Sequence, residues 1–255
     1  MRTLITNDDG IDSPGIRVLA GVAIRAGLDV VIAAPSWDSS GASASLTAVE
    51  HDGRLLFEER ELDDVDAPAY AVEAAPAFIV RAAATGAFGP APDLVLSGVN
   101  LGPNTGHAVL HSGTVGAALT GWTNGARAMA ISVEVGPSIH WDTVVSVASV
   151  TLRWVMDSEA ANILNVNVPN VAPEDLAGIR RAKLAAFGAV QATITERGQG
   201  WVSLSYTGVD ADHEPGTDAA LLAAGVATFT PLRAVCESED VNTDELDQLV
   251  ASCVR

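Results

Sequence analysis

Two adjacent carboxylates, Asp8 and Asp9, follow the first short apolar run of the chain. Adjacent carboxylates repel each other unless a cation or hydrogen-bond donors compensate their charge. At a turn from strand to loop both can point into one site, and Gly10 gives the backbone the freedom for such a turn. A solvated helix cap would also use this pair, but its place at the end of a hydrophobic strand favours a cation site.

Two further oxygen-rich loops follow predicted strands in the same way. Residues 36–45 supply seryl hydroxyls, and residues 97–100 supply the amide of Asn100. Ligands in open α/β sheets bind at the carboxyl ends of the strands, so the three loops are expected to converge. Carboxylate, hydroxyl and amide oxygens form a hard ligand set, suited to Mg²⁺, Mn²⁺ or Ca²⁺. No His or Cys occurs in these loops, which disfavours zinc.

A candidate anion site lies further along the chain, at Ser112, Gly113 and Thr114, directly ahead of a predicted helix. Small residues at a helix N-terminus expose backbone N–H groups to an anion, and the helix dipole favours one there. Asn104 lies in the preceding glycine-rich loop, which leaves room for a phosphate. His111 is adjacent and could protonate a leaving oxygen, although a structural role fits it equally well.

The first half of the chain alternates short β-rich runs with helical patterns, which is typical of βαβ units and a parallel sheet. We therefore predict an α/β fold with a mostly parallel sheet. The expected strands span residues 3–6, 29–34, 93–97, 128–133 and 163–168, and the expected helices span residues 14–26, 76–85, 114–122 and 142–156.

Two segments differ from this pattern. Residues 46–73 predict an antiparallel ribbon with a turn at Asp52-Gly53, and its acidic stretch is expected to be a solvated edge. After residue 170, alternating segments predict a hairpin with its turn at residues 197–200, followed by a closing amphipathic helix over 243–254. The hairpin segments are residues 180–187, 192–195 and 202–206. We expect one domain, residues 1–255, with a core over about 1–170 and a β-rich appendage over about 171–255.

The charge balance limits the possible partners. The 255 residues include 14 Lys and Arg against 32 Asp and Glu, a formal charge of −18. This field repels long nucleic acid but tolerates a small anionic substrate if a bound cation reverses the sign locally. We find no signal peptide and no apolar span of about 18 residues, so we expect a soluble cytoplasmic protein without a membrane contact. Cys236 and Cys253 are expected to be thiols.

Taken together, the motifs resemble those of the SurE (survival protein E) nucleotidase family in order and spacing, over nearly the whole chain. The matching segments are Asn7-Asp8-Asp9-Gly10, Pro14-Gly15-Ile16, Ala34-Pro35, Ser40-Gly41-Ala42-Ser43, Ser97-Gly98-Val99-Asn100-Leu101-Gly102-Pro103-Asn104, Ser112-Gly113-Thr114-Val115-Gly116-Ala117-Ala118, Asn165-Val166-Asn167-Val168-Pro169, Gly216-Thr217-Asp218 and Thr230-Pro231-Leu232.

The resemblance implies a Rossmann-like, three-layer fold and a phosphomonoesterase of the 5′-nucleotidase type, which releases inorganic phosphate from nucleoside 5′- and 3′-monophosphates. It also implies one divalent metal ion per subunit, Mg²⁺ or Mn²⁺ with Ca²⁺ possible in a crystal, and a homodimer or homotetramer built partly through the C-terminal half. By motif, the metal ligands are Asp8, Asp9, Ser40 and Asn100, with either Asp as base or nucleophile. The residues expected to contact phosphate or substrate are Asn7, Gly41, Asn104, Ser112, Gly113 and Thr114.

Two positions depart from the family pattern. Ser39 stands where the family has Arg, and residues 74–79, Ala-Ala-Pro-Ala-Phe-Ile, replace a Gly-Thr-Pro-x-Asp-Cys segment. If this segment faces the pocket, the loss of its hydroxyl and carboxylate should weaken discrimination among nucleotides. Alternatively, Phe78 and Ile79 point into the core from the helix that starts at Pro76, and recognition is unaffected by them.

Three other functions compete with this one. A metal-dependent N-deacetylase also has an Asp-Asp pair after its first strand, but it resembles His-Pro-Asp-Asp and uses zinc, whereas Thr6-Asn7 precede the pair here. A non-catalytic nucleotide-binding module would use the same loops without turnover. A dinucleotide oxidoreductase is poorly supported because no G-x-G-x-x-G follows the first strand.

Overall fold

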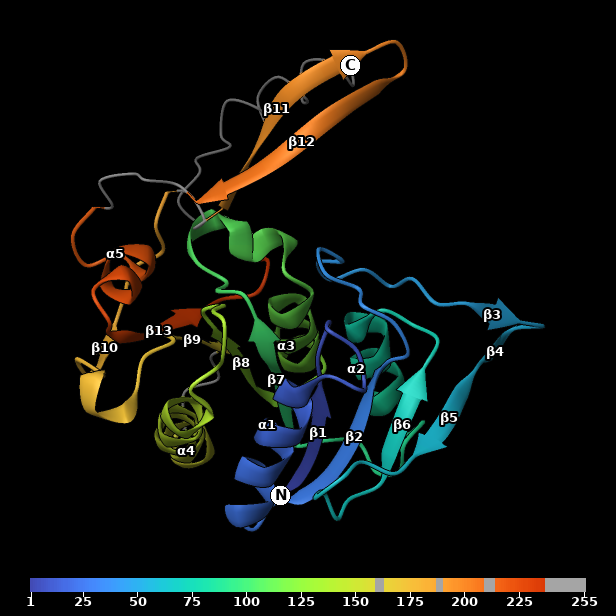
Figure 1. The fold of residues 1–255 in the computed structure, drawn as a ribbon. Helices are drawn as coiled ribbons and strands as arrows, with labels where there is room; N and C mark the ends of the chain where they lie inside the picture. The colour runs from blue at the N-terminus through green and yellow to red at the C-terminus, as the bar shows by residue number, and fades with distance from the viewer. Residues whose placement is uncertain (159–162, 187–189, 209–213, 237–255) are drawn as a thin grey trace, which may run out of the picture.

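The computed structural model describes residues 1–158, 163–186, 190–208 and 214–236. Its centre is a nine-stranded sheet in the order β10-β13-β9-β8-β7-β1-β2-β6-β5 (Figure 1). The strands of this sheet are β1 (Arg2–Thr6), β2 (Asp29–Pro35), β5 (Phe57–Arg60), β6 (Ala69–Val72), β7 (Leu94–Leu101), β8 (Arg127–Val133), β9 (Ile163–Val168), β10 (Ile179–Arg181) and β13 (Ala227–Leu232). The helices are α1 (Pro14–Arg25), α2 (Pro76–Ala84), α3 (Gly113–Thr123), α4 (Trp141–Asp157), α5 (Asp218–Ala223) and the 3-10 helices η1 (Gly106–His111) and η2 (Pro173–Asp175).

The six central strands from β9 to β6 run parallel. They are apolar along most of their length because both faces of the sheet are covered by helices. In β1, Ile5 packs in the cluster that includes α1 and α4, and Leu4 packs in the cluster that includes α2. The predicted three-layer α/β fold is thus confirmed.

The strand β7 is longer than the sequence predicts, because it continues through Gly98 to Leu101. Its pairing with β8 is irregular between Ser97 and Asn100. Gly98 has φ +131°, and a Cβ there would lie 2.2 Å from the carbonyl oxygen of Ile131, so only glycine fits. The glycine and asparagine of the segment Ser97-Gly98-Val99-Asn100 predict a loop, and here this segment forms a bulge instead.

The segment from 46 to 73 contains the predicted turn at Asp52-Gly53, between β3 (Glu50–His51) and β4 (Arg54–Leu55). Its two longer strands, however, belong to the main sheet, because β6 pairs parallel with β2 and β5 closes the edge antiparallel to β6. Every residue of β5 is exposed, as expected for a solvated acidic edge.

The predicted hairpin after residue 170 is confirmed in part. Strands β11 (Val190–Gly198) and β12 (Trp201–Gly208) form it, and it projects from the body of the molecule (Figure 1). The prediction of a hairpin strand over 180–187 is wrong for Arg180 and Arg181, which belong to β10 and pair parallel with β13 in the main sheet, and residue 187 lies outside the described residues. The strand β13 is not among the predicted strands, because it contains Pro231, and proline usually argues against an interior strand. The predicted helix over 243–254 and Cys253 lie outside the described residues.

Two smaller observations complete the fold. Cys236 is an exposed free thiol. Within the described ranges, no helix is both long enough and apolar enough to span a membrane.

The approach of α1 to β7 yields a stability prediction. A Cβ on Gly15 would lie 2.0 Å from the carbonyl oxygen of Val99, whereas one on Gly21 in the same helix would meet only the end of the flexible Arg25 side chain. Gly15→Ala should therefore cost about 3 kcal/mol by overpacking. Gly21→Ala should be neutral or stabilising by up to about 1 kcal/mol through helix propensity. Urea unfolding measures both, and equal midpoints would contradict the close approach.

Candidate active site

Asp8 is the centre of the site, at the carboxyl end of β1. Its side chain is 3% exposed and accepts two hydrogen bonds from Thr114 at the start of α3, one from the backbone N–H to Oδ2 at 3.0 Å and one from the hydroxyl to Oδ1 at 2.5 Å. The positive end of the helix dipole also faces this carboxylate. The helix N-terminus that was expected to meet a phosphate therefore holds Asp8 as well.

Gly113 makes this contact possible. A Cβ on residue 113 would lie 2.7 Å from Oδ2 of Asp8, too close for any side chain. As the first residue of α3, Gly113 has a backbone N–H with no partner inside the helix. The preceding residue, Ser112, caps α3 because its side chain accepts the N–H of Val115.

Asp9 is less buried and faces the end of β7. Its Oδ2 accepts the backbone N–H of Leu101 at 3.1 Å. Asn100, the neighbouring residue, donates its Nδ2 to the carbonyl of Gly102 at 2.6 Å, which fixes the amide and leaves its Oδ1 available as a ligand. The first and third loops therefore meet, as predicted from their place after parallel strands.

The serine loop reaches the same point. Ser39 donates its N–H to the carbonyl of Asp8 at 2.7 Å and its hydroxyl to the same oxygen at 3.3 Å. Ser40 instead donates its hydroxyl to Asp38 at 2.6 Å. Residue type alone does not distinguish these two serines as ligands, but their contacts do, since Ser39 fastens the loop to Asp8 and Ser40, the residue that the family motif indicates, keeps oxygen lone pairs for a ligand.

Ser43 connects this loop to η1. Its N–H donates to the carbonyl of His111 at 3.2 Å, and its hydroxyl donates to that of Leu110 at 2.7 Å. Gly116 permits the approach, because a Cβ there would lie 2.3 Å from the carbonyl oxygen of Ser43. The His111 side chain is exposed at the end of η1, one residue before Ser112.

The remaining predicted residues have structural contacts. Asn7 is buried and donates its Nδ2 to the carbonyl of Gly10 and to the hydroxyl of Ser13, so it fixes the turn that carries the two carboxylates. Gly41 is exposed, with φ +79°.

Asn104 belongs to a buried amide network. Its carbonyl accepts from Asn165 and Asn167 on β9, and its own side chain donates to Ser132 on β8. Asn165 and Asn167 are not among the predicted site residues. Polar residues at fully buried strand positions are the signal that could have found them.

The electrostatics of the site favour a bound cation. Burial raises the pKa of Asp8, against the lowering effect of the Thr114 hydrogen bonds. Burial also raises the pKa of Asp9 to about 6, and the charges of Asp8 and Asp38 add to this shift. The hydroxyl of Ser40 lowers the pKa of Asp38. Within the described part of the chain the one ion pair is elsewhere, so no Lys or Arg offsets these carboxylates.

The altered segment at residues 74–79 lies in the core. Ile79 is fully buried in the cluster between α2 and the sheet, and Phe78 packs against the same cluster. Of the two interpretations of this segment, the structure favours core packing.

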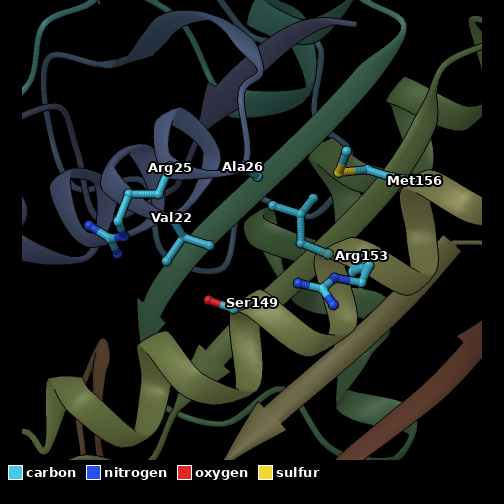
Figure 2. Close-up of a pocket in the computed structure, with 7 residues that line it drawn as sticks. Val22, Arg25, Ala26, Ser149, Arg153 and Met156 are labelled. Carbon is cyan, nitrogen blue, oxygen red and sulfur yellow. The ribbon is translucent and has the colours of Figure 1, made fainter.

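A separate hollow of about 370 Å³ lies between α1 and α4. Figure 2 shows Arg25 and Arg153 on its two sides, from the ends of different helices. Arg25 is the last residue of α1, whereas Asp8 and Asp9 precede the first residue of this helix. The hollow therefore lies at the end of α1 that is far from the two carboxylates. It contains none of the predicted site residues.

The fold and the site define a three-layer α/β protein with a carboxylate pair and an exposed helix N-terminus at the carboxyl edge of its sheet. The family model "Survival protein SurE" matches residues 3–190. A 5′/3′-nucleotidase SurE from Shigella dysenteriae is 34% identical over 258 residues, which cover 98% of each chain. A 5′-nucleotidase SurE from Methylococcus capsulatus is 35% identical, over 98% of this chain and 97% of the relative.

A crystal structure of the SurE protein from Aquifex aeolicus superposes with a TM-score of 0.77 at 27% identity, over 98% of this chain and 100% of that one. The chain belongs to the SurE family. This confirms the resemblance that the motifs carry, and with it the predicted enzyme class, a hydrolase of the 5′-nucleotidase type.

The raised pKa of Asp9 yields a prediction for stability in excess chelator. Because the folded-state pKa of about 6 exceeds the ordinary 3.8, this carboxyl stabilises the fold below about pH 4, and that contribution is lost as the pH rises through 6. Asp9→Asn, which cannot ionise, should therefore melt a few degrees above wild type at pH 7.5, and the difference should close by pH 4. Thermal unfolding at the two pH values measures this. A constant difference would show that the effect is not electrostatic.

Proposed function

We propose that the protein is a divalent-metal-dependent phosphomonoesterase that hydrolyses nucleoside 5′- and 3′-monophosphates, or a closely related small phosphate ester, to release inorganic phosphate. The observation that carries this proposal is the carboxylate pair of buried Asp8 and half-buried Asp9, which has no cationic partner among the described residues, with Asp8 directly against the N-terminus of α3. The names of the relatives, 5′/3′-nucleotidases, support the substrate class.

The residues present fit a hard divalent cation. Asp8, Asp9, Ser40 and Asn100 offer carboxylate, hydroxyl and amide oxygens, the donors that Mg²⁺ and Mn²⁺ prefer. Among the described residues no three His, Cys, Asp or Glu side chains are grouped so that they could hold a metal ion by themselves, so a cation here would also need the hydroxyl and amide oxygens. When bound, the ion would polarise a phosphoryl oxygen and offset the charge that develops there.

Unpartnered oxygens around the carboxylates also fit a hydrated ion. Thr6 Oγ1, Asn7 Oδ1 and Ser97 Oγ are buried, and no hydrogen-bond partner for them occurs in the described chain. Thr6, the last residue of β1, is the register partner of Ser97 in β7, and Thr6 lies two residues before Asp8. Buried polar atoms normally have a partner, often an ordered water molecule. Polar surroundings of this kind suit an ion that retains part of its water shell.

Within this site the residues have different roles. Both oxygens of Asp8 accept hydrogen bonds from Thr114, which fixes the orientation of this carboxylate. Among the described contacts Asp9 has one oxygen engaged, so it is the better placed of the two to accept a proton from an attacking water. The N–H of Gly113 and the hydroxyl of Ser112 are the donors at the start of α3 that remain for the phosphate.

Two alternative functions are an N-deacetylase and a non-catalytic nucleotide-binding module. An N-deacetylase is not supported, because the chain belongs to the SurE family and its carboxylate pair lies among oxygen donors. A non-catalytic nucleotide-binding module has the same site and differs only in turnover.

Phosphate release from AMP, GMP, CMP, UMP and their 3′ isomers tests the function. Activity should appear with Mg²⁺ or Mn²⁺ and disappear in excess chelator, since loss of the cation leaves the developing charge unsupported. Asp9→Asn should fold and lose on the order of 10²-fold or more in rate. Full activity in excess chelator would contradict the metal assignment. Tight nucleotide binding without phosphate release would instead support the binding module.

The proposed role of His111 as general acid is tested by comparing substrates with poor and good leaving groups. His111→Ala should lower the rate by roughly 10²-fold on nucleotides, which have poor leaving groups, and much less on an activated aryl phosphate. His107→Ala is a matched control, because His107 is also exposed on η1. An equal loss on both substrates would indicate a structural role.

We also propose a homodimer or homotetramer in the cytoplasm. The projecting hairpin supports association, because Ile194, Trp201 and Val202 are each about half exposed on it. Apolar side chains gathered on an exposed element are typical of a protein contact.

A further inference from the structure

Asp218 is a buried carboxylate outside the site described so far. It lies at the first position of α5 and is 0% exposed. Its Oδ2 accepts the N–H of Gly106 at 2.8 Å, and its Oδ1 accepts the N–H groups of Ala185 and Ala219, both at 2.9 Å. Three backbone donors thus converge on one side chain.

These donors come from three separate segments. Ala219 is in α5 itself, Ala185 follows β10, and Gly106 is the first residue of η1. The segments also contact each other directly, because the N–H of Asp218 donates to the carbonyl of Lys183 at 2.8 Å and that of His107 donates to the carbonyl of Ala185 at 3.2 Å. Asp218 is therefore the point where the C-terminal part of the chain is fastened to η1.

The chemistry of this contact requires a carboxylate. A buried charge is costly unless it is hydrogen-bonded, and hydrogen bonds to an ionised oxygen are stronger than neutral ones. An asparagine has a single acceptor oxygen, so it cannot accept from Gly106 on one side and from Ala185 and Ala219 on the other. Its NH₂ group would face an N–H donor instead.

The fastened segment leads directly into the candidate site. From Gly106, η1 runs to His111, and Ser112 and Gly113 follow as the expected phosphate donors beside Asp8. The far end of η1 is held by Ser43. The path and tilt of η1 are thus set at its start by Asp218 and at its end by the serine loop.

We propose that Asp218 is a positioning residue for catalysis, which holds η1 so that the Ser112–Gly113 donors and His111 are oriented toward the phosphate. This inference rests on the proposed function, but its structural part can be tested separately. Among the described residues the carboxylate of Asp218 accepts hydrogen bonds from backbone N–H groups, so we expect it to act through η1 without touching substrate.

The test compares Asp218→Asn with Thr217→Ala. Thr217 is buried next to Asp218 and caps α5 through the N–H of Ala220, so its loss destabilises the same turn without touching η1. Thermal unfolding first compares the melting temperatures of the two variants. Hydrogen exchange is then followed in peptides covering residues 104–112, and kcat is measured on AMP with Mn²⁺.

In Asp218→Asn we expect exchange over residues 104–112 at least about 10-fold faster than in Thr217→Ala, because the anchoring acceptor of Gly106 is lost. We expect kcat to fall by about 10²-fold, the usual effect of a misplaced catalytic group. The Mn²⁺ concentration that gives half-maximal activity should stay within about 3-fold of the wild-type value, because the expected metal ligands Asp9, Ser40 and Asn100 lie on other loops.

If Asp218→Asn does not fold, Gly106→Ala alters the same junction from its other side, because residue 106 has φ +58°. It should show the same pattern with a smaller effect. Exchange and kcat no different from those of Thr217→Ala would overturn the proposal, as would faster exchange with unchanged kcat. An inactive wild type would overturn the proposed function, and the exchange result would then stand on its own.

Discussion

The contact between Thr114 and Asp8 is the interaction on which the site depends. It joins the end of β1 to the start of α3 across 106 positions of sequence and buries a carboxylate against a helix N-terminus. Gly113 allows the approach, and Ser39 fastens the serine loop to the carbonyl of the same Asp8. Three loops therefore share one anchor, and a shift of α3 would displace all of them together.

This arrangement lowers the stability of the folded chain. Burial disfavours the charged forms of Asp8 and Asp9, and the overall charge of −18 adds to the unfavourable field. Carboxylates whose pKa is strongly raised by burial are typical of a functional site. A divalent cation in this position would turn the same charges into a source of binding energy and of stability.

The sequence predicted the loops of the site because each follows a buried apolar run, and strand ends of a parallel sheet share one edge. It could not predict the partners of the polar groups. Asp8, the acceptor of Thr114, and two of the three donors to Asp218, Gly106 and Ala185, lie more than 30 positions away, where local pattern carries no information. Similarly, Gly98 and Asn100 indicate a loop by composition. Only the folded structure shows that the carbonyl oxygen of Ile131 approaches Gly98 closely, which explains the glycine in the bulge of β7. Family motifs supplied Ser40, and geometry separates it from Ser39.

The exposed edge of the sheet at β5 has a consequence for aggregation. An outermost strand offers unpaired backbone groups to any other chain, and proteins usually protect it with charge. Here Glu58 and Glu59 occupy the centre of the strand, and an acidic stretch follows it. Two copies that met strand to strand at this edge would bring like charges face to face, which is destabilising. The strand therefore discourages continuous sheet growth and leaves that end of the molecule resistant to fibril-like stacking.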